Sequence, residues 1–234
     1  MLRKRMLFWK NRQLAMGNLL TMHREAICNM SSTKSNIKIS KAKAKQLFQE
    51  GYELAFESKK KIKPWDKIFD LWNIAANAEN TRAQFYLGTC YDLGKGVVKN
   101  LSEAFNWYMK AAQRGMMEAQ YNIGFFYKEG EIVKQDFKKA VYWYSLAAKQ
   151  GDIEAQRDLG YCYFYGEGLK QDHLKAIYWY KKAAKQGDDK ALYNLGLCYE
   201  FGDGVNQSIR WAKYYFNKAS KLGHRKATNK LKKL

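Results

Sequence analysis

The chain has 234 residues, of which 47% are hydrophobic and 15% aromatic, so it holds enough apolar material for a packed core and is not disordered throughout. Lys and Arg outnumber Asp and Glu by 42 to 22, and the formal charge of +20 attracts nucleic acid, anionic lipid and acidic proteins without selecting among them. A single proline favours helices over strands. We therefore expect an all-α protein.

Residues 1–40 are basic and include a polar stretch from Ser31 to Asn36, which predicts a disordered N-terminal segment. Two alternatives stay open. The arginines, with Glu25 as the single acid, also fit a mitochondrial presequence, and Met30 could be the true start. Polar residues from Lys10 onward interrupt the first apolar run, which argues against an export signal, and no run approaches the roughly 18 apolar residues of a membrane helix.

Residues 41–80 read as a degenerate repeat that caps one end of a repeat array. Leu71-Trp72 and Ala75-Ala76 stand in register with residues of the later repeats, and Pro64 stands where the second helix of the unit would begin. Repeat arrays need such a terminal unit, because a bare end would expose apolar surface.

An internal repeat with a period of 36 residues covers residues 81–224. Shifting the chain by one period aligns Ala83, Ala119, Ala155, Ala191 and Ala227; Gly88, Gly124, Gly160 and Gly196; Tyr91, Tyr127, Tyr163 and Tyr199; and Trp107, Trp143, Trp179 and Tyr215. This register excludes coincidence and predicts a stack of four repeats. The tryptophan ladder is expected to fill the core between them.

Each repeat reads as a first helix, a glycine-bearing turn and a second helix, which we call helix A and helix B. Small and apolar residues recur three and four apart in both halves, as in Ala155, Leu159 and Cys162. The start of helix B is marked by a capping residue in every repeat: Asn100, Asp136, Asp172 and Ser208. Helix B then ends at a glycine, and lysine-rich residues 225–234 predict a short C-terminal capping helix.

The runs from Ala155 to Gly168 and from Asp172 to Gly187 resemble Sel-1-like repeats, a branch of the tetratricopeptide superfamily. The resemblance implies a right-handed α/α superhelical solenoid of helix-turn-helix repeats. It also implies a non-enzymatic scaffold or adaptor that binds a peptide or loop of another protein on the concave face lined by helix A.

No pattern in the sequence points to catalysis, a metal or a cofactor. It contains no Gly-x-Ser-x-Gly, no phosphate-binding glycine loop, no Cys-x-x-Cys and no pair of histidines at helical spacing. Cys90, Cys162 and Cys198 recur at one repeat position, where a thiol acts as a small buried hydrophobe and disulfides are disfavoured. We expect a protein that is not an enzyme, in a reducing compartment and hence cytoplasmic. The alternatives are a mitochondrial protein, or one delivered into a host cell if the source is an intracellular bacterium.

Positions on the helix A face nominate the partner-binding residues. They are Arg82, Phe85, Tyr86, Glu118, Tyr121, Asn122, Phe125, Arg157, Asp158, Tyr161, Lys190, Tyr193 and Asn194. Aromatic side chains can supply buried area while the asparagines hydrogen-bond an extended peptide backbone. Arg157 and Lys128 are expected to be available to bind an isolated carboxylate. The competing interpretation is that many of these aromatics only pack between neighbouring A helices.

A second function stays open because the lysines gather on helix B. The alternative is a nucleic-acid or anionic-surface binder that uses the N-terminal segment and these lysines, with weak and salt-dependent binding to nucleic acid. The aromatics, however, recur at core spacing and are not expected to interleave with Lys or Arg as a stacking platform.

Overall fold

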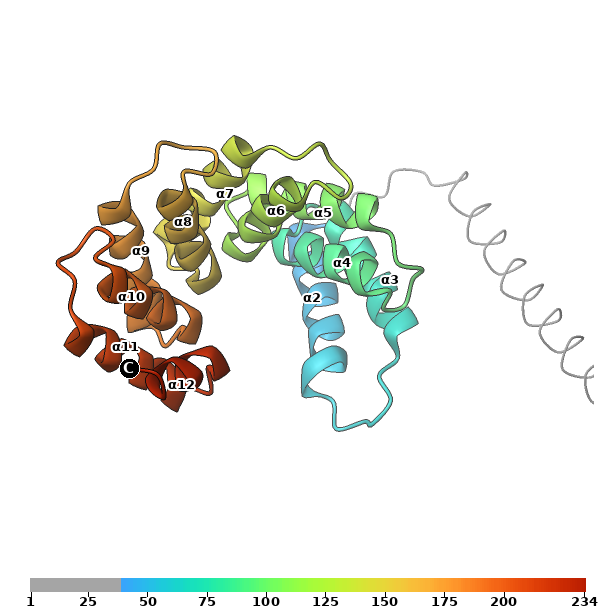
Figure 1. The fold of residues 1–234 in the computed structure, drawn as a ribbon. Helices are drawn as coiled ribbons and strands as arrows, with labels where there is room; N and C mark the ends of the chain where they lie inside the picture. Colours follow the sequence, from blue (N-terminus) through green and yellow to red (C-terminus); the bar gives the residue numbers. More distant parts are fainter. Residues whose placement is uncertain (1–38) are drawn as a thin grey trace, which may run out of the picture. The chain divides into compact units, whose positions relative to one another are not determined.

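A computed structural model describes residues 39–234, and residues Ser40–Leu234 form one compact unit (Figure 1). All regular elements of this described part are helices, which confirms the all-α class. The predictions for the N-terminal segment, including a disordered tail, a presequence and a start at Met30, lie outside the described residues.

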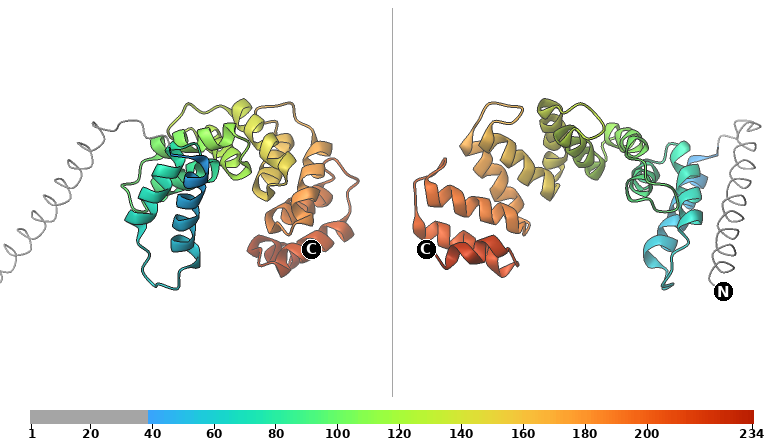
Figure 2. Two further views of the ribbon diagram at one scale, coloured as in Figure 1. Left: turned by 180° about the vertical axis from the view of Figure 1, so that it is seen from behind. Right: turned by 45° about the vertical axis from the view of Figure 1, so that its right-hand side comes forward.

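The unit is a succession of helix pairs in which each helix packs on the next. The pairs are α2 (Lys41–Tyr52), continued by the π-helical turn η1 (Glu53–Glu57), with α3 (Trp65–Asn77); α4 (Thr81–Leu93) with α5 (Leu101–Gln113); α6 (Met117–Glu129) with α7 (Phe137–Gln150); α8 (Ile153–Tyr165) with α9 (His173–Lys185); and α10 (Asp189–Phe201) with α11 (Ile209–Lys221), followed by α12 (Arg225–Leu231). The pairs follow one another in a curved row, with α4, α6, α8 and α10 on its inner side and the helices after them on its outer side (Figures 1 and 2).

Local sequence explains where the helices begin and end. The side chains of Asn100, Asp136, Asp172 and Ser208 accept a hydrogen bond from the backbone amide three residues later, so each caps a helix B as predicted. Helix A ends at a glycine in the left-handed conformation in every repeat, as at Gly94 (φ 67°) and Gly166 (φ 76°).

The glycines inside helix A receive an aromatic ring from helix B. A Cβ atom at Gly124 would lie 2.6 Å from the Tyr144 ring, and Gly160 meets Tyr180 in the same way. This contact explains why a residue unfavourable in helices recurs there. Tyr108, Tyr144, Tyr180 and Phe216 are buried. Of the predicted tryptophan ladder, Trp107 is buried as well, but Trp143 and Trp179 are only partly buried and flank the core.

A ladder of glutamines links successive repeats along their edge. The buried Gln120 donates to the Ala112 carbonyl at 3.2 Å, and Gln150 donates to the Gln120 side-chain oxygen at 2.8 Å and to the Gly115 carbonyl at 3.1 Å. Gln156 and Gln186 repeat this arrangement one unit later.

The first rung of this ladder differs from the others. Arg114 stands where Gln150 stands in the next repeat, and it binds the Glu79 carbonyl (3.1 Å) and carboxylate (3.1 Å). The side-chain oxygen of the buried Gln84 is left without a hydrogen-bond partner among the described residues.

Cys90, Cys162 and Cys198 are free, buried thiols, as the repeat position predicted. Burial raises the pKa of each thiol to about 12. The thiolate is therefore scarce at neutral pH in the folded protein, and these cysteines serve as packing residues.

Candidate functional site

The residues nominated from sequence lie on α4, α6, α8 and α10, but they do not share one environment. Arg82, Glu118, Phe125, Tyr161 and Lys190 are exposed. The others are half-buried: Phe85, Tyr86, Tyr121, Asn122, Arg157, Asp158, Tyr193 and Asn194. The structure thus divides the predicted face into side chains open to a partner and side chains that join repeats.

At the N-terminal end, Tyr86 is part of an aromatic cluster. Its ring centroid lies 5.7 Å from that of Phe48, 5.9 Å from that of Tyr52 and 4.9 Å from that of Trp72. The Arg82 guanidinium lies over the Phe48 ring at 5.0 Å. Burial raises the pKa of Tyr86. Here the packing interpretation is the better description, because the tyrosine fills the junction between α2, α3 and α4.

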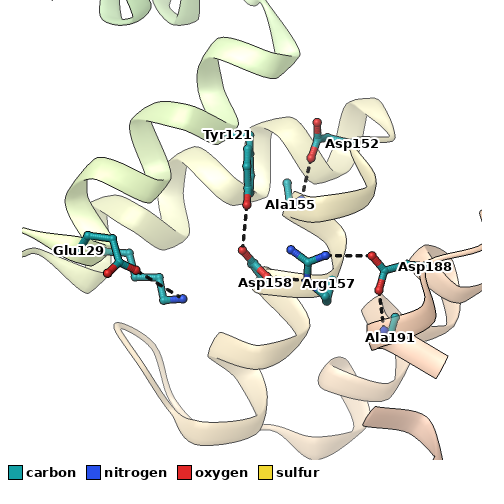
Figure 3. Close-up of polar contacts among 9 residues, drawn as sticks. Tyr121, Glu129, Asp152, Ala155, Arg157, Asp158, Asp188 and Ala191 are labelled. Carbon is teal, nitrogen blue, oxygen red and sulfur yellow. Dashed lines mark hydrogen bonds and ion pairs between the residues drawn. The ribbon is translucent and has the colours of Figure 1, made fainter. Parts of the chain in front are cut away.

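In the centre, four side chains form a polar chain across three repeats (Figure 3). The Tyr121 hydroxyl donates to Asp158 at 3.3 Å, Arg157 Nε donates to Asp158 at 2.9 Å, and the other end of the guanidinium reaches Asp188 at 2.9 Å. Asp188 also caps α10 through the Ala191 amide. These side-chain hydrogen bonds therefore connect α6, α8 and α10.

The contacts among these four side chains keep Arg157 charged and Tyr121 protonated. Burial by itself lowers the pKa of Arg157, but the contacting Asp158 and Asp188 carboxylates raise it overall. Burial and the Asp158 carboxylate raise the pKa of Tyr121, which keeps its hydroxyl as a donor. Arg157 is therefore not the free cation that the sequence predicted for an isolated carboxylate of a ligand. Sequence reasoning also missed Asp188, although its place in the row of helix A caps was a signal.

Two asparagines and a row of aromatics remain open on the same face. Asn122 and Asn194 are half-buried, and within the described residues neither side chain makes a hydrogen bond to another group. Phe125 is 45% exposed and Tyr161 36% exposed, at equivalent positions of successive repeats. Lys128 Nζ lies 5.5 Å from the centre of the Tyr161 ring.

A recess opens on this face between α8, α10 and the start of α12. It is lined by Arg157, Asp158, Tyr161, Asp189, Lys190, Tyr193, Asn194, Gly223, His224, Arg225 and Lys226. The His224 ring stacks on Tyr193 at 4.5 Å, and its Nδ1 accepts the Ala227 amide at 3.1 Å. The residues from Gly223 onward were not nominated from sequence. The register of Ala227 could have placed them, since it makes α12 the next helix A.

The structure also corrects the expectation that the helix B aromatics all occupy core positions. Tyr142, Tyr178 and Tyr214 recur at one position of α7, α9 and α11, and each is exposed. Lysines stand beside them, as with Lys182, whose ammonium lies 4.9 Å from the Tyr178 ring centre. Aromatic and basic side chains therefore do interleave on the outer side of the row.

Among the described residues, no group of acidic, histidine and cysteine side chains has an arrangement suited to a metal ion. In the same range, no helix is long and apolar enough to cross a bilayer. The buried tyrosines and cysteines with raised pKa values contact the core and not a cleft.

The helix pairs, their period and the glycine and aromatic contacts define an α/α repeat scaffold. The Sel1 repeat model matches residues 81–116, 118–152, 153–188 and 189–224, and the chain belongs to the Sel1 repeat family. This confirms the resemblance seen in the sequence. Proteins with Sel1 repeats generally mediate protein–protein interaction and are typically scaffolds without enzymatic activity.

Two solved structures with the same architecture are of bacterial proteins. A protective antigen of uropathogenic Escherichia coli with an SLR fold is 34% identical, with a TM-score of 0.76, over 80% of this chain and 40% of that one. The chain thus spans less than half of that protein. A Sel1 repeat protein from Oxalobacter formigenes is 29% identical, with a TM-score of 0.73, over 92% of this chain and 86% of that one. No match was found among the curated proteins.

Proposed function

We propose that this protein is a scaffold that binds an extended segment of a partner protein along the inner, helix A face of α6, α8 and α10. The observation that carries the proposal is that Asn122 and Asn194, two half-buried residues, make no intramolecular side-chain hydrogen bond in the described part of the chain, and their amides are open to solvent. Such an amide is free to exchange its water for the backbone of a ligand, and a ligand that covered it without supplying a partner would lose free energy.

The side chains around the two asparagines suit a peptide. Phe125 and Tyr161 offer partly exposed aromatic area between them, and such residues often anchor an interface. An extended backbone presents both a donor and an acceptor at each residue, which matches the two hydrogen-bonding ends of an asparagine amide.

The charges along the face predict the orientation in which a ligand segment binds. Exposed Glu118 and Glu154 stand on α6 and α8, so a neutral or basic segment fits there. At the other end, the recess carries Lys190, Arg225 and Lys226, which favour an acidic side chain or a carboxyl terminus. Arg157 contributes little to this balance, because Asp158 and Asp188 already bind it.

A photo-crosslinking amino acid placed at Phe125 tests the proposal in the native cell. We expect partner crosslinks that are lost in the double variant Asn122→Ala with Asn194→Ala, because truncating central anchors costs about 2 kcal/mol of binding. The variant must keep the helical spectrum and melting temperature of the parent protein.

The matched control carries the crosslinker at Asn106 on α5, an exposed helix B position. Identical partners from both positions, or crosslinks at position 125 that survive the double substitution, would reject the inner face as the binding site.

A further inference from the structure

The outer side of the row carries a surface that the inner-face proposal does not use. Helices α7, α9 and α11 contain three, four and four basic residues, and none contains Asp or Glu. Tyr142 is 57% exposed, Tyr178 51% and Tyr214 43%. The packing of the core does not explain why an exposed tyrosine recurs on three helices whose charged residues are all basic.

The helical period places these tyrosines in line with lysines. Tyr142 and Lys149, Tyr178 and Lys185, and Tyr214 and Lys221 are each seven residues apart and exposed, so they lie on one face of their helix. Because the three pairs stand at equivalent repeat positions, they form a stripe across three helices, which we call the outer stripe.

Neighbouring side chains orient the tyrosines of the outer stripe. Lys218, which stands beside the stripe four residues after Tyr214, has its ammonium 4.7 Å from the centre of the Tyr214 ring. Each tyrosine packs edge-to-face with the aromatic residue that follows it, as in Tyr142 and Trp143, whose ring centroids lie 5.2 Å apart. A lysine held against a ring loses part of its freedom before any ligand arrives, while its remaining N–H groups can still donate to an anion.

The first repeat lacks the outer stripe altogether. On α5, Asn106 stands in the tyrosine position and Gln113 in the lysine position, and the helix carries Glu103. The surface is therefore not a general property of the repeat. This difference supplies a built-in control.

We propose that the outer stripe is a second binding surface, which takes an acidic segment of a partner protein that also carries apolar side chains. Charge complementarity selects the carboxylates, and the tyrosine rings select the apolar residues between them. Single-stranded nucleic acid fits less well, because stacking of a base needs a bare ring face, and lysine ammonium groups lie over Tyr178 and Tyr214.

A labelled peptide of Glu and Ser with several interspersed Phe residues is the probe, compared with the same peptide in which every Phe is Ser. By fluorescence anisotropy at low salt, we expect the Phe-containing peptide to bind about fivefold more tightly. The triple variant Tyr142→Ser, Tyr178→Ser and Tyr214→Ser should abolish that preference. The triple variant Lys149→Gln, Lys185→Gln and Lys221→Gln should weaken both peptides about tenfold.

The control variant Asn106→Ser on α5 should bind like the parent protein. Two results would overturn the proposal. One is that the two peptides bind with equal affinity, or that neither peptide binds. The other is tyrosine-dependent binding of oligo(dT) or of phosphatidylserine vesicles that is tighter than binding of the Phe-containing peptide, which would assign the surface to nucleic acid or to lipid. All substituted side chains are exposed, so unchanged melting temperatures are expected to accompany the supporting result.

Discussion

The helix A face is held together by different interactions at its N-terminal end and in its centre. Tyr86 and Asp158 occupy the same position of different repeats, yet Tyr86 packs among the rings of Phe48, Tyr52 and Trp72, whereas Asp158 binds Tyr121 and Arg157. Aromatic packing and ion pairing therefore serve the same structural purpose in the first and the third repeat. The position joins two A helices in these two repeats by different chemistry, whereas Asn122 and Asn194 at the same position of the other two repeats make no such side-chain hydrogen bond among the described residues.

The largest expected effect comes from breaking the aromatic end. Trp72 is buried and its Nε1 donates to the Phe48 carbonyl at 3.3 Å. Replacing Trp72 with Ala leaves a cavity at the junction of α2 and α3, and the free energy of unfolding should fall by about 3 to 5 kcal/mol in urea titrations. Phe56→Ala is the control at the exposed rim of the cluster, and an equal loss there would contradict a buried centre at Trp72.

Breaking the polar centre should cost less. Asp158→Ala removes two hydrogen bonds but leaves Arg157 with Asp188, so we expect a loss of about 1 to 3 kcal/mol. Arg157→Met with Asp158→Ala removes both charges. We expect the double variant to lose less free energy of unfolding than the two single variants, Arg157→Met and Asp158→Ala, lose together. A loss equal to that sum in thermal and urea unfolding would show that the two side chains are not coupled.

Two tyrosines sharpen the comparison within the core. The Tyr108 hydroxyl donates to Thr89 at 3.2 Å, whereas the buried Tyr144 hydroxyl has no partner among the described residues. Tyr144→Phe should therefore raise the free energy of unfolding by up to about 1 kcal/mol, and Tyr108→Phe should lower it slightly. Phe216, at the same position of the fourth repeat, shows that the ring alone fits. Opposite signs for the two substitutions are the decisive result in paired denaturation curves.

The smallest expected effect concerns the first rung of the glutamine ladder. Arg114→Gln should allow the new side chain to bind the unpartnered oxygen of Gln84, as Gln150 binds Gln120. The lost ion pair with Glu79 is exposed and contributes little. We expect a net gain of about 0.5 to 1 kcal/mol.

The control for this rung is Arg114→Ala, which removes the ion pair without completing the rung. It should be neutral or slightly destabilising in the same melts. A gain in stability from the alanine variant as well would show that removal of the arginine, and not the new hydrogen bond, is responsible.

The parts of the fold that depend on local sequence were predictable. The period, the capping residues of helix B and the glycines that end helices follow from rules that act within a few residues of chain. The tryptophan ladder was predicted correctly at Trp107 but not at Trp143 and Trp179, because two aromatic residues are adjacent there and the phase of the helix decides which one points inward. Phe216 was an available clue, since phenylalanine in the last repeat marks a position where the hydroxyl is dispensable.

The candidate site was less predictable because its chemistry depends on neighbours one repeat away. The open positions, such as Phe125 and Asn194, were found from the register alone. Arg157 was predicted to be free, because Asp188, which caps α10 and binds the guanidinium from the next helix A, was not considered. This pairing leaves no periodic trace, because the positions equivalent to Arg157 hold the uncharged residues Phe85, Tyr121 and Tyr193.

The buried cysteines can report the local opening of individual repeats. Cys90 lies in the first repeat and Cys198 in the last, at equivalent depth and with the same raised pKa, so a thiol reagent reaches either one only when its own repeat opens. In a chain whose Cys28 is replaced, the ratio of their labelling rates would tell which end of the row breathes first. Labelling of Cys162 would report the opening of the third repeat in the same way. The second repeat has Phe126 at this position and therefore cannot be labelled there.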